Sequence, residues 1–520
     1  MPWKPDLRLT LLAALSMSLA WRIRGQFGHE IGATIAGALG ALAIALLSGR
    51  EDWQKRAPHF ALLGALGWAF GGSMSYMKVV GYCHSSDSAT VLYGFAGLFL
   101  IGFLWAAMGG AGTALPALIE EEKLGSLYPA LAAVFGLWFV ADVGAAFHRM
   151  SGGSLGWRDS DWYPATVALL AALGLALFRK RLDFGTSLIM HLAAGWWAGM
   201  LLLVVALDLH LNPPRGENWA GCLGLFAGLM LFCVRQGLKD LALLSVVTGL
   251  LGGIGFVLGQ AIKLAFLSSG ATLRLSAAGG GWHCVMEWIH GLLFGLALAI
   301  AMAPLGRRGP TVSSGALPRW TRIFAVFFVL WVIPYLNFRK SPALWRRTLK
   351  SLPDTFGGLP VTAGFDPSRG FLGWFELLFL LLGAVLVWAM LRRSALVPES
   401  PPGRGQLLFL VFQWSFVIIS FAHVLPEMTP FLFLVQWVIA MQAIACTALV
   451  LHPARVAPPI SSGPIYRGAS SRMIVSATLL GILAIFAGWS LKRALYGDTF
   501  AVGFYMDHIR FGPNHTNNKR

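Results

Sequence analysis

About fifteen apolar segments, each close to the length that crosses a lipid bilayer, follow one another along this chain. In a bilayer every backbone N–H and C=O group must be paired within the protein, so segments of this length fold as α-helices. Only 12% of the residues are charged and 57% are hydrophobic, whereas soluble domains usually carry about twice that charged fraction. The sequence therefore predicts an all-α polytopic membrane protein.

The expected helices lie between short connections that hold most of the charged, Gly and Pro residues. The expected spans are 7–22, 27–48, 57–80, 90–117, 127–148, 162–178, 184–209, 219–235, 240–267, 284–304, 320–337, 370–392, 405–424, 429–451 and 471–491. Within WRIRGQFGHE, residues 21–30, the first helix ends, a tight turn holds Arg22 and Arg24, and His29 and Glu30 open the second helix.

Basic residues collect in loops that fall on one side of the membrane if the spans alternate in direction. Because Lys and Arg gather in short cytoplasmic loops, we expect this side to be cytoplasmic. The N-terminus is then cytoplasmic and the C-terminal tail periplasmic or extracellular. A bacterial inner membrane is the expected location, because the sequence shows no long tails or targeting segments of a eukaryotic kind.

The formal net charge of +17 would indicate a nucleic-acid partner in a soluble protein. Here the basic residues are spread over membrane loops, so membrane lipids are the expected partners and nucleic acid is not.

Loop 338–369 is basic although the alternation of spans puts it outside. An amphipathic segment lying on anionic lipid explains this loop, and a miscounted helix is the alternative.

An internal repeat is expected from glycine spacings that recur in the two halves of the chain. The matching sets are Gly64, Gly67 and Lys78 with Gly249, Gly252 and Lys263. We expect two parallel six-helix units, residues 1–183 and 184–392, then three helices in 393–491 and a polar outer tail, 492–520. The alternative is that Gly-rich membrane helices resemble one another by composition alone. Parallel repeats occur in several transporters.

A cationic pocket is expected on the outer side, where charged groups lie close to the ends of helices. Arginine binds carboxylate or phosphate through two parallel hydrogen bonds, and a helix N-terminus nearby adds to the attraction for an anion. The residues expected to bind substrate are Arg22, Arg24, Lys78, Lys263, Arg215 and His290. The alternative is that single residues at helix ends extend to lipid head groups.

Four further residues are candidates for proton transfer: His29, Glu30, Glu287 and Asp142. Acids inside apolar spans are costly unless they are paired or face a cavity, so Glu287 and Asp142 indicate function. Glu287 and His290 are three residues apart, so on a helix they share a face. An E-x-x-H pair also occurs in metal-binding bundles, but no second pair accompanies it here, so no metal and no cofactor are expected.

Cysteine usage leaves one question open at the outer side. Cys83 and Cys284 occupy corresponding loops of the expected repeat and each neighbours a histidine, so a disulfide or a Zn²⁺ site there stays an alternative. No phosphate-binding loop, metalloprotease or hydrolase motif occurs in the sequence, and no soluble segment is large enough for an ATPase.

We expect a secondary transporter or permease with an outward-facing cationic pocket for an anionic small molecule or a lipid-linked substrate. Lys78 and Lys263 would anchor the anion, Glu287 and Asp142 would carry protons, and Arg22, Arg24 and Glu30 would form the outer gate. A membrane-embedded transferase or polymerase acting on a lipid-linked substrate, with His29 or Glu30 as base, is the alternative. A non-catalytic subunit of a membrane complex is the third reading.

Overall fold

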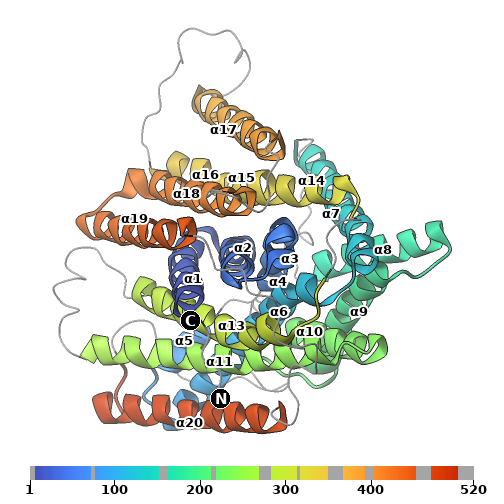
Figure 1. The fold of residues 1–520 in the computed structure, drawn as a ribbon. Coiled ribbons are helices and arrows are strands. Elements are labelled where there is room, and N and C mark those ends of the chain that lie inside the picture. The colour runs from blue at the N-terminus through green and yellow to red at the C-terminus, as the bar shows by residue number, and fades with distance from the viewer. Residues whose placement is uncertain are drawn as a thin grey trace.

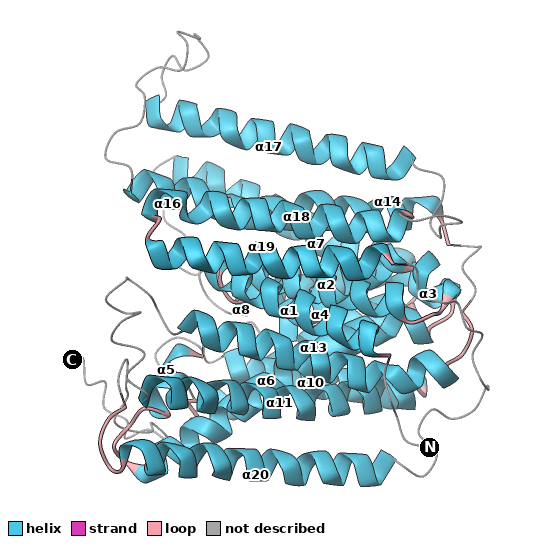
Figure 2. Ribbon diagram, turned by 60° about the vertical axis from the view of Figure 1, so that its left-hand side comes forward, coloured by secondary structure: helices cyan, strands magenta, loops and turns pink. Residues whose placement is uncertain are grey.

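A computed structural model gives the fold of this chain. It describes residues 6–71, 76–150, 162–211, 218–268, 283–312, 317–348, 367–392, 403–452 and 470–501. These residues form helices joined by loops, and the long helices run nearly parallel to one another (Figure 2). Within the described residues, 12 helices are long and apolar enough to cross a membrane. The chain is therefore an all-α, multi-pass membrane protein, as its sequence predicts.

Six helices make up the middle of the molecule (Figure 1). They are α1 (Leu7–Phe27), α2 (Glu30–Leu47), α4 (Ala57–Gly71), α6 (Ser88–Leu118), α11 (Lys239–Ser268) and α13 (His283–Arg308). α1 packs between α2 and α13, and α4 packs against α2 and α6. α11 packs against α6 and α13, so the six helices form one continuous core.

The remaining helices surround this core. On one side lie α7 (Glu121–Met150), α8 (Trp162–Arg179), α9 (Phe184–Gly199), the π-helix η2 (Met200–Ala206) and α10 (Asn218–Gln236). Another group holds α14 (Arg319–Phe327), the π-helix η3 (Phe328–Val332), α15 (Ile333–Phe338), α16 (Lys340–Thr348), α17 (Pro367–Arg392), α18 (Arg404–Val424), the 3-10 turn η5 (Leu425–Glu427) and α19 (Pro430–Leu451). α20 (Ser470–Tyr496) packs against α11, and α3 (Glu51–Lys55) and α5 (Met77–Tyr82) are short helices at opposite ends of the core.

α6 lies between α4 and α11 and meets both through glycine. A Cβ on Gly67 of α4 would come 2.5 Å from the carbonyl oxygen of Met108, and a Cβ on Gly102 of α6 would come 2.8 Å from that of Gly252. Helices in lipid gain little from burying apolar surface against each other, so close approach of backbones supplies the packing energy. The small residues that suggested a repeat therefore hold α4 and α11 against a shared neighbour.

The structure revises two boundaries near the start of the chain. α1 continues through both arginines to Phe27, so Arg22 and Arg24 are helical rather than part of a tight turn. The chain then reverses at Gly28, whose φ of +90° favours glycine, and α2 begins at Glu30. The expected span 57–80 is also divided, because α4 ends at Gly71 and α5 begins at Met77.

At the end of the core that holds α3, two buried arginines fasten loops to helix ends. Arg50 donates to the carbonyl oxygens of Gly309 and Pro310, at 3.1 and 2.7 Å, and pairs with Asp52. Arg56 is fully buried, and its Nη1 donates to the carbonyl oxygens of Pro116 and Ile119, both at 2.8 Å. These bonds satisfy carbonyl groups that the ends of α13 and α6 leave unpaired.

Candidate functional site

The last turns of α1 carry two arginines that meet one buried glutamate from α13. Arg22 Nη1 lies 3.2 Å from Glu287 Oε2, and Arg24 Nη1 lies 3.6 Å from Glu287 Oε1. The side chains of Arg22, Arg24 and Glu287 are 9%, 2% and 3% exposed, so water screens the three charges little. We call these residues, with Tyr76, His29 and His283, the arginine cluster.

Glycine in α1 and α13 makes this meeting possible. A Cβ on Gly25 would overlap the carboxylate of Glu287, and a Cβ on Gly291 or Gly295 would overlap the backbone of α1. Since these positions lack side chains, the two helices approach closely enough for Glu287 to reach across α1 between its arginines. Gly25 itself is exposed, so the carboxylate lies just beneath an accessible stretch of backbone.

Arg24 is surrounded by aromatic rings. Its guanidinium carbon lies 5.2 Å from the centre of the Trp21 ring, 5.2 Å from Tyr76 and 5.0 Å from Trp105. Its Nη1 donates to the Tyr76 hydroxyl at 3.1 Å, and its Nη2 lies 2.5 Å from His29 Nδ1. The faces of aromatic rings attract a cation, so this environment stabilises the charge of Arg24 in one position.

Tyr76 joins the glutamate to a histidine. Its hydroxyl lies 3.5 Å from Glu287 Oε1 and 3.3 Å from His283 Nε2, and its ring stacks on that of His283. Burial raises the pKa of the Tyr76 hydroxyl above its ordinary value, so the group keeps its proton. Having accepted from Arg24, Tyr76 can donate its proton to either Glu287 or His283.

Arg22 differs from Arg24 in how many of its guanidinium nitrogens contact other groups of the protein. Both arginines leave Nε buried without a hydrogen-bond partner. The one contact described for Arg22 is the ion pair from Nη1 to Glu287, whereas Arg24 uses Nη1 and Nη2. Arg22, Arg24 and Lys263 all act electrostatically on the ring of His283. Lys263 is 8% exposed and lies on the buried face of α11. Two cations thus share one carboxylate, with Lys263 beyond His283, so the described charges of this region are positive in sum.

The short helix α16 contacts the end of α1 that carries the arginine cluster. Lys340, at the start of α16, donates to the carbonyl oxygen of Phe27, the last residue of α1. α16 is held in turn by α18, since Ser341 Oγ lies 2.9 Å from His423 Nδ1 and Trp345 donates to the carbonyl of Ala422. The described start of the basic loop 338–369 therefore covers the end of α1 that carries the site.

Some of the other expected site residues lie apart from the arginine cluster. His290 faces α11: its ring stacks on Phe256, and its Nε2 lies 3.1 Å from the Phe256 carbonyl oxygen. Glu287 and His290 therefore point to different helices, and His283, one turn before Glu287, is the histidine that lies beside the carboxylate at 3.7 Å. Asp142 lies on α7, which packs mainly against α8, α9 and α14.

The remaining candidates are placed as follows. Glu30 is exposed in the first turn of α2 and acts electrostatically on Lys340. Lys78 is half-buried in α5, at the same end of the core as Lys263. Arg215 lies outside the described residues. Cys83 and Cys284 are buried and form no disulfide within the described part of the chain. Across the described ranges, no group of three or more His, Cys, Asp and Glu residues is arranged to hold a metal ion.

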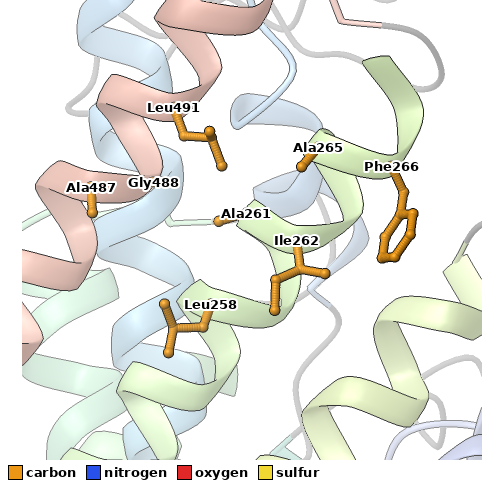
Figure 3. A pocket seen from close by; sticks show the side chains of 8 residues that line it. All are labelled: Leu258, Ala261, Ile262, Ala265, Phe266, Ala487, Gly488 and Leu491. Atoms are coloured by element: carbon orange, nitrogen blue, oxygen red, sulfur yellow. The ribbon is translucent and has the colours of Figure 1, made fainter. Parts of the chain in front are cut away.

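A groove of about 580 Å³ runs between α11 and α20 on the outside of the bundle. Leu258, Ile262, Phe266 and Leu491 line it with several alanines (Figure 3). All the lining side chains are apolar, as suits a surface against lipid tails. Lys263 points away from the groove, since Lys263 is buried whereas its neighbour Ile262, which lines the groove, is 38% exposed.

Sequence reasoning did not select three residues of the site region. Tyr76 lies in a loop before a six-residue helix and carries no charge, so no spacing or burial pattern marks it. His283 is the histidine that precedes Cys284 on the expected outer side, but which group it contacts depends on the rotation of α13. Lys340 belongs to a loop whose basic charge is more simply explained by lipid.

No family model and no solved structure matches the chain. It is similar to the methylenomycin A resistance protein of Streptomyces coelicolor, with 30% identity over 272 residues. The match covers 49% of this chain and 51% of that protein, so the chain spans about half the length of the curated relative. The comparisons and the fold together identify a multi-pass helical membrane protein and assign it to no family.

Proposed function

We propose that this protein is a membrane transporter for an anionic small molecule, and that the arginine cluster is its binding site. The observation that carries the proposal is the meeting of Arg22 and Arg24 with one buried carboxylate, beside Lys263. A buried cation without a full counter-charge is costly in a membrane, and such groups mark substrate pathways. A site with more positive than negative groups takes an anion.

The packing around the site supports movement. α1 and α13 meet through Gly291 and Gly295, so the helices that carry the arginines and the glutamate contact each other by backbone. Residues without side chains interlock little, and sliding of packed helices is a common form of conformational change. Shear between α1 and α13 would separate Glu287 from Arg22 and open the site.

Glu287 is the acid best placed to carry a proton. The groups that face it are Arg22 and Arg24 from α1, Tyr76 before α5, His283 and Cys284 from α13, with Lys263 of α11 beyond His283. When α1 moves away, the carboxylate loses both cations and gains stability by taking a proton. Transport of the anion would then be coupled to proton movement.

The relative supports transport in a general way. It is named for resistance to methylenomycin A. A protein built from membrane helices gives resistance most simply by moving a compound across the membrane, whereas a scaffold subunit does not. The supported substrate class is an anion, and the compound itself stays open.

A membrane-embedded transferase is the second candidate. It is favoured by the convergence of Arg24, His29, Tyr76 and His283 at one end of the core, where a base and two cations could act on a lipid-linked substrate. A transferase would keep this site open to one side of the membrane only, and this separates it from a transporter.

The accessibility of introduced cysteines from each side of the membrane distinguishes a transporter from a transferase. Lys78→Cys and Lys263→Cys would be made in a variant without the five native cysteines, and labelled from each side of sealed vesicles with an impermeant maleimide. Ala89→Cys, exposed at the same end, and Glu51→Cys, exposed at the opposite end, report the two sides. Labelling of Lys263→Cys from both sides supports transport. Labelling from the Ala89 side alone would overturn it in favour of the transferase.

A further inference from the structure

Within the arginine cluster, the two arginines are held in different ways. Arg24 uses both of its terminal nitrogens on protein groups and is enclosed by three aromatic rings. Arg22 has a single described ion pair, from Nη1 to Glu287 Oε2. Both arginines leave Nε buried without a partner. Arg24 is therefore a fixed part of the site, whereas the hydrogen-bonding edge of Arg22 is only half used.

Glu287 bridges these two cations in the way that a bound carboxylate would. Its two oxygens are divided between them, Oε2 to Arg22 and Oε1 to Arg24 and Tyr76. The carboxylate comes from the neighbouring helix and lies directly over Gly25, where α1 has no side chain and its backbone is exposed. A small carboxylate arriving from outside could approach along this uncovered backbone.

We propose that Glu287 holds the place of a carboxylate on the transported compound, which binds Arg22 and Arg24 when Glu287 moves out. The inference rests on the proposed function and adds the chemical class of the substrate, a carboxylic acid in its ionised form. Arg22 binds the incoming carboxylate side-on through Nε and Nη2, the planar arrangement for which a guanidinium is suited. Arg24 and Tyr76 then take the second oxygen.

Two further groups suit this exchange. Lys263 lies beyond His283 and lends positive charge to the site without an ion pair of its own being described. Trp21, Trp68 and Phe294 pack with each other on the side of Arg24, with ring centres 4.8–5.9 Å apart, so the surroundings of the site on this side are apolar. An acid with a short hydrophobic body fits this combination.

Chemical rescue tests the proposal without the natural substrate. Glu287→Ala removes the internal carboxylate and leaves Arg22 and Arg24 buried without a counter-charge, so the purified protein unfolds at a lower temperature. Added acetate or propionate takes the vacant place and raises the unfolding temperature in proportion to the logarithm of its concentration. Acetamide and propionamide, which have the same shapes without the charge, give no rise.

Control variants make the result specific. Wild-type protein and Glu122→Ala, which removes an exposed acid, show no rise with acetate. If Glu287→Ala does not fold alone, it is expressed and purified in acetate or in acetamide, and folded protein is expected with acetate only.

The outcomes separate this inference from the transport proposal. Stabilisation of Glu287→Ala by acetate, or recovery of this variant as folded protein in acetate alone, supports a replaceable carboxylate when the controls show neither. Equal effects of acetate and acetamide, or no effect of acetate, overturn it. The rescue by acetate needs no movement across a membrane, so it can succeed while the two-sided labelling of Lys263→Cys fails. Labelling from both sides can likewise succeed while acetate has no effect.

Discussion

Asp52 accepts two hydrogen bonds from a single guanidinium, that of Arg50. Arg50 Nε lies 2.9 Å from Oδ1 and Nη2 lies 2.6 Å from Oδ2, and the Val312 N–H donates to Oδ2 at 3.0 Å. One carboxylate thereby ties the α2–α3 connection to the chain that follows α13. This pair lies at the opposite end of the core from the arginine cluster.

We predict that Asp52→Asn destabilises the protein by about 2 kcal/mol, because the amide cannot accept from both arginine nitrogens and Val312. Burial alone would raise the pKa of Asp52, but the Arg50 and Val312 hydrogen bonds outweigh it and lower the pKa. The stabilisation is therefore present above the ordinary aspartate range near pH 4 and is lost as the pH falls through the lowered value. Thermal unfolding from pH 7 to pH 3 measures it, and a difference between the two proteins that does not shrink in acid would contradict the argument.

Arg56 offers a second prediction about the same end of the core. Its Nη1 satisfies the last carbonyls of α6, so Arg56→Ala should cost about 3 kcal/mol, since the Pro116 and Ile119 oxygens lose their donor. Arg56→Lys keeps the charge but reaches only one carbonyl, and should cost less than Arg56→Ala. Equilibrium unfolding in detergent gives both values. Equal stability of the two variants would show that the hydrogen bonds contribute nothing beyond packing.

His29 is expected to make the end of the core that carries the arginine cluster sensitive to acid. Burial and the neighbouring Arg24 charge lower the pKa of His29 to about 3, from the ordinary 6.5. The unfolded chain therefore binds a proton between pH 6.5 and 3 while the folded protein does not, and stability falls as the pH falls through that range. His29→Gln keeps an acceptor for Arg24 but cannot titrate, so its stability should vary less with pH. Thermal unfolding of the wild type and of His29→Gln between pH 7 and pH 4 measures this. If stability changes with pH equally in both proteins, His29 is not the source of the acid sensitivity.

The α1–α13 contact gives a prediction about packing. A Cβ on Gly295 would overlap the Ala13 carbonyl, so Gly295→Ala should force the helices apart and cost about 1–3 kcal/mol. It should also lengthen the distance between Arg22 and Glu287. Gly136→Ala, in open space, should change stability by no more than about 1 kcal/mol, with helix propensity slightly in its favour. Chemical unfolding of both variants is the measurement, and similar losses would refute the close approach.

The helices of this chain could be predicted because a segment that crosses a membrane needs about 20 consecutive apolar residues, and such segments are easily recognised in a sequence. Where a helix begins or ends also depends on its neighbours in space, which length and apolar content do not record, and two limits near the start of the chain show this. α1 passes through two arginines because Glu287 and the aromatic rings offset their charges, and this compensation comes from other helices. The division at Gly71 follows from local geometry that apolar composition does not register.

The site was predictable in part for a related reason. Arg22, Arg24 and Glu287 stand out because charges are rare in apolar sequence. Their convergence depends on which way α13 faces, and a single sequence does not fix that rotation: it suggested His290 as the partner, whereas His283 lies beside the carboxylate. The expected repeat, the cytoplasmic N-terminus and the pairing of Lys78 with Lys263 remain predictions.

The glycine contacts of α6 have a mechanical consequence. Between Gly67 and Met108 on one face, and Gly102 and Gly252 on the other, the surfaces in contact are nearly smooth backbone. Pulling such surfaces apart loses many close contacts at once, whereas displacement along the helix axis exchanges each contact for a similar one. The core is therefore stiff to separation and compliant to shear, and α6 sets the direction in which α4 and α11 can move.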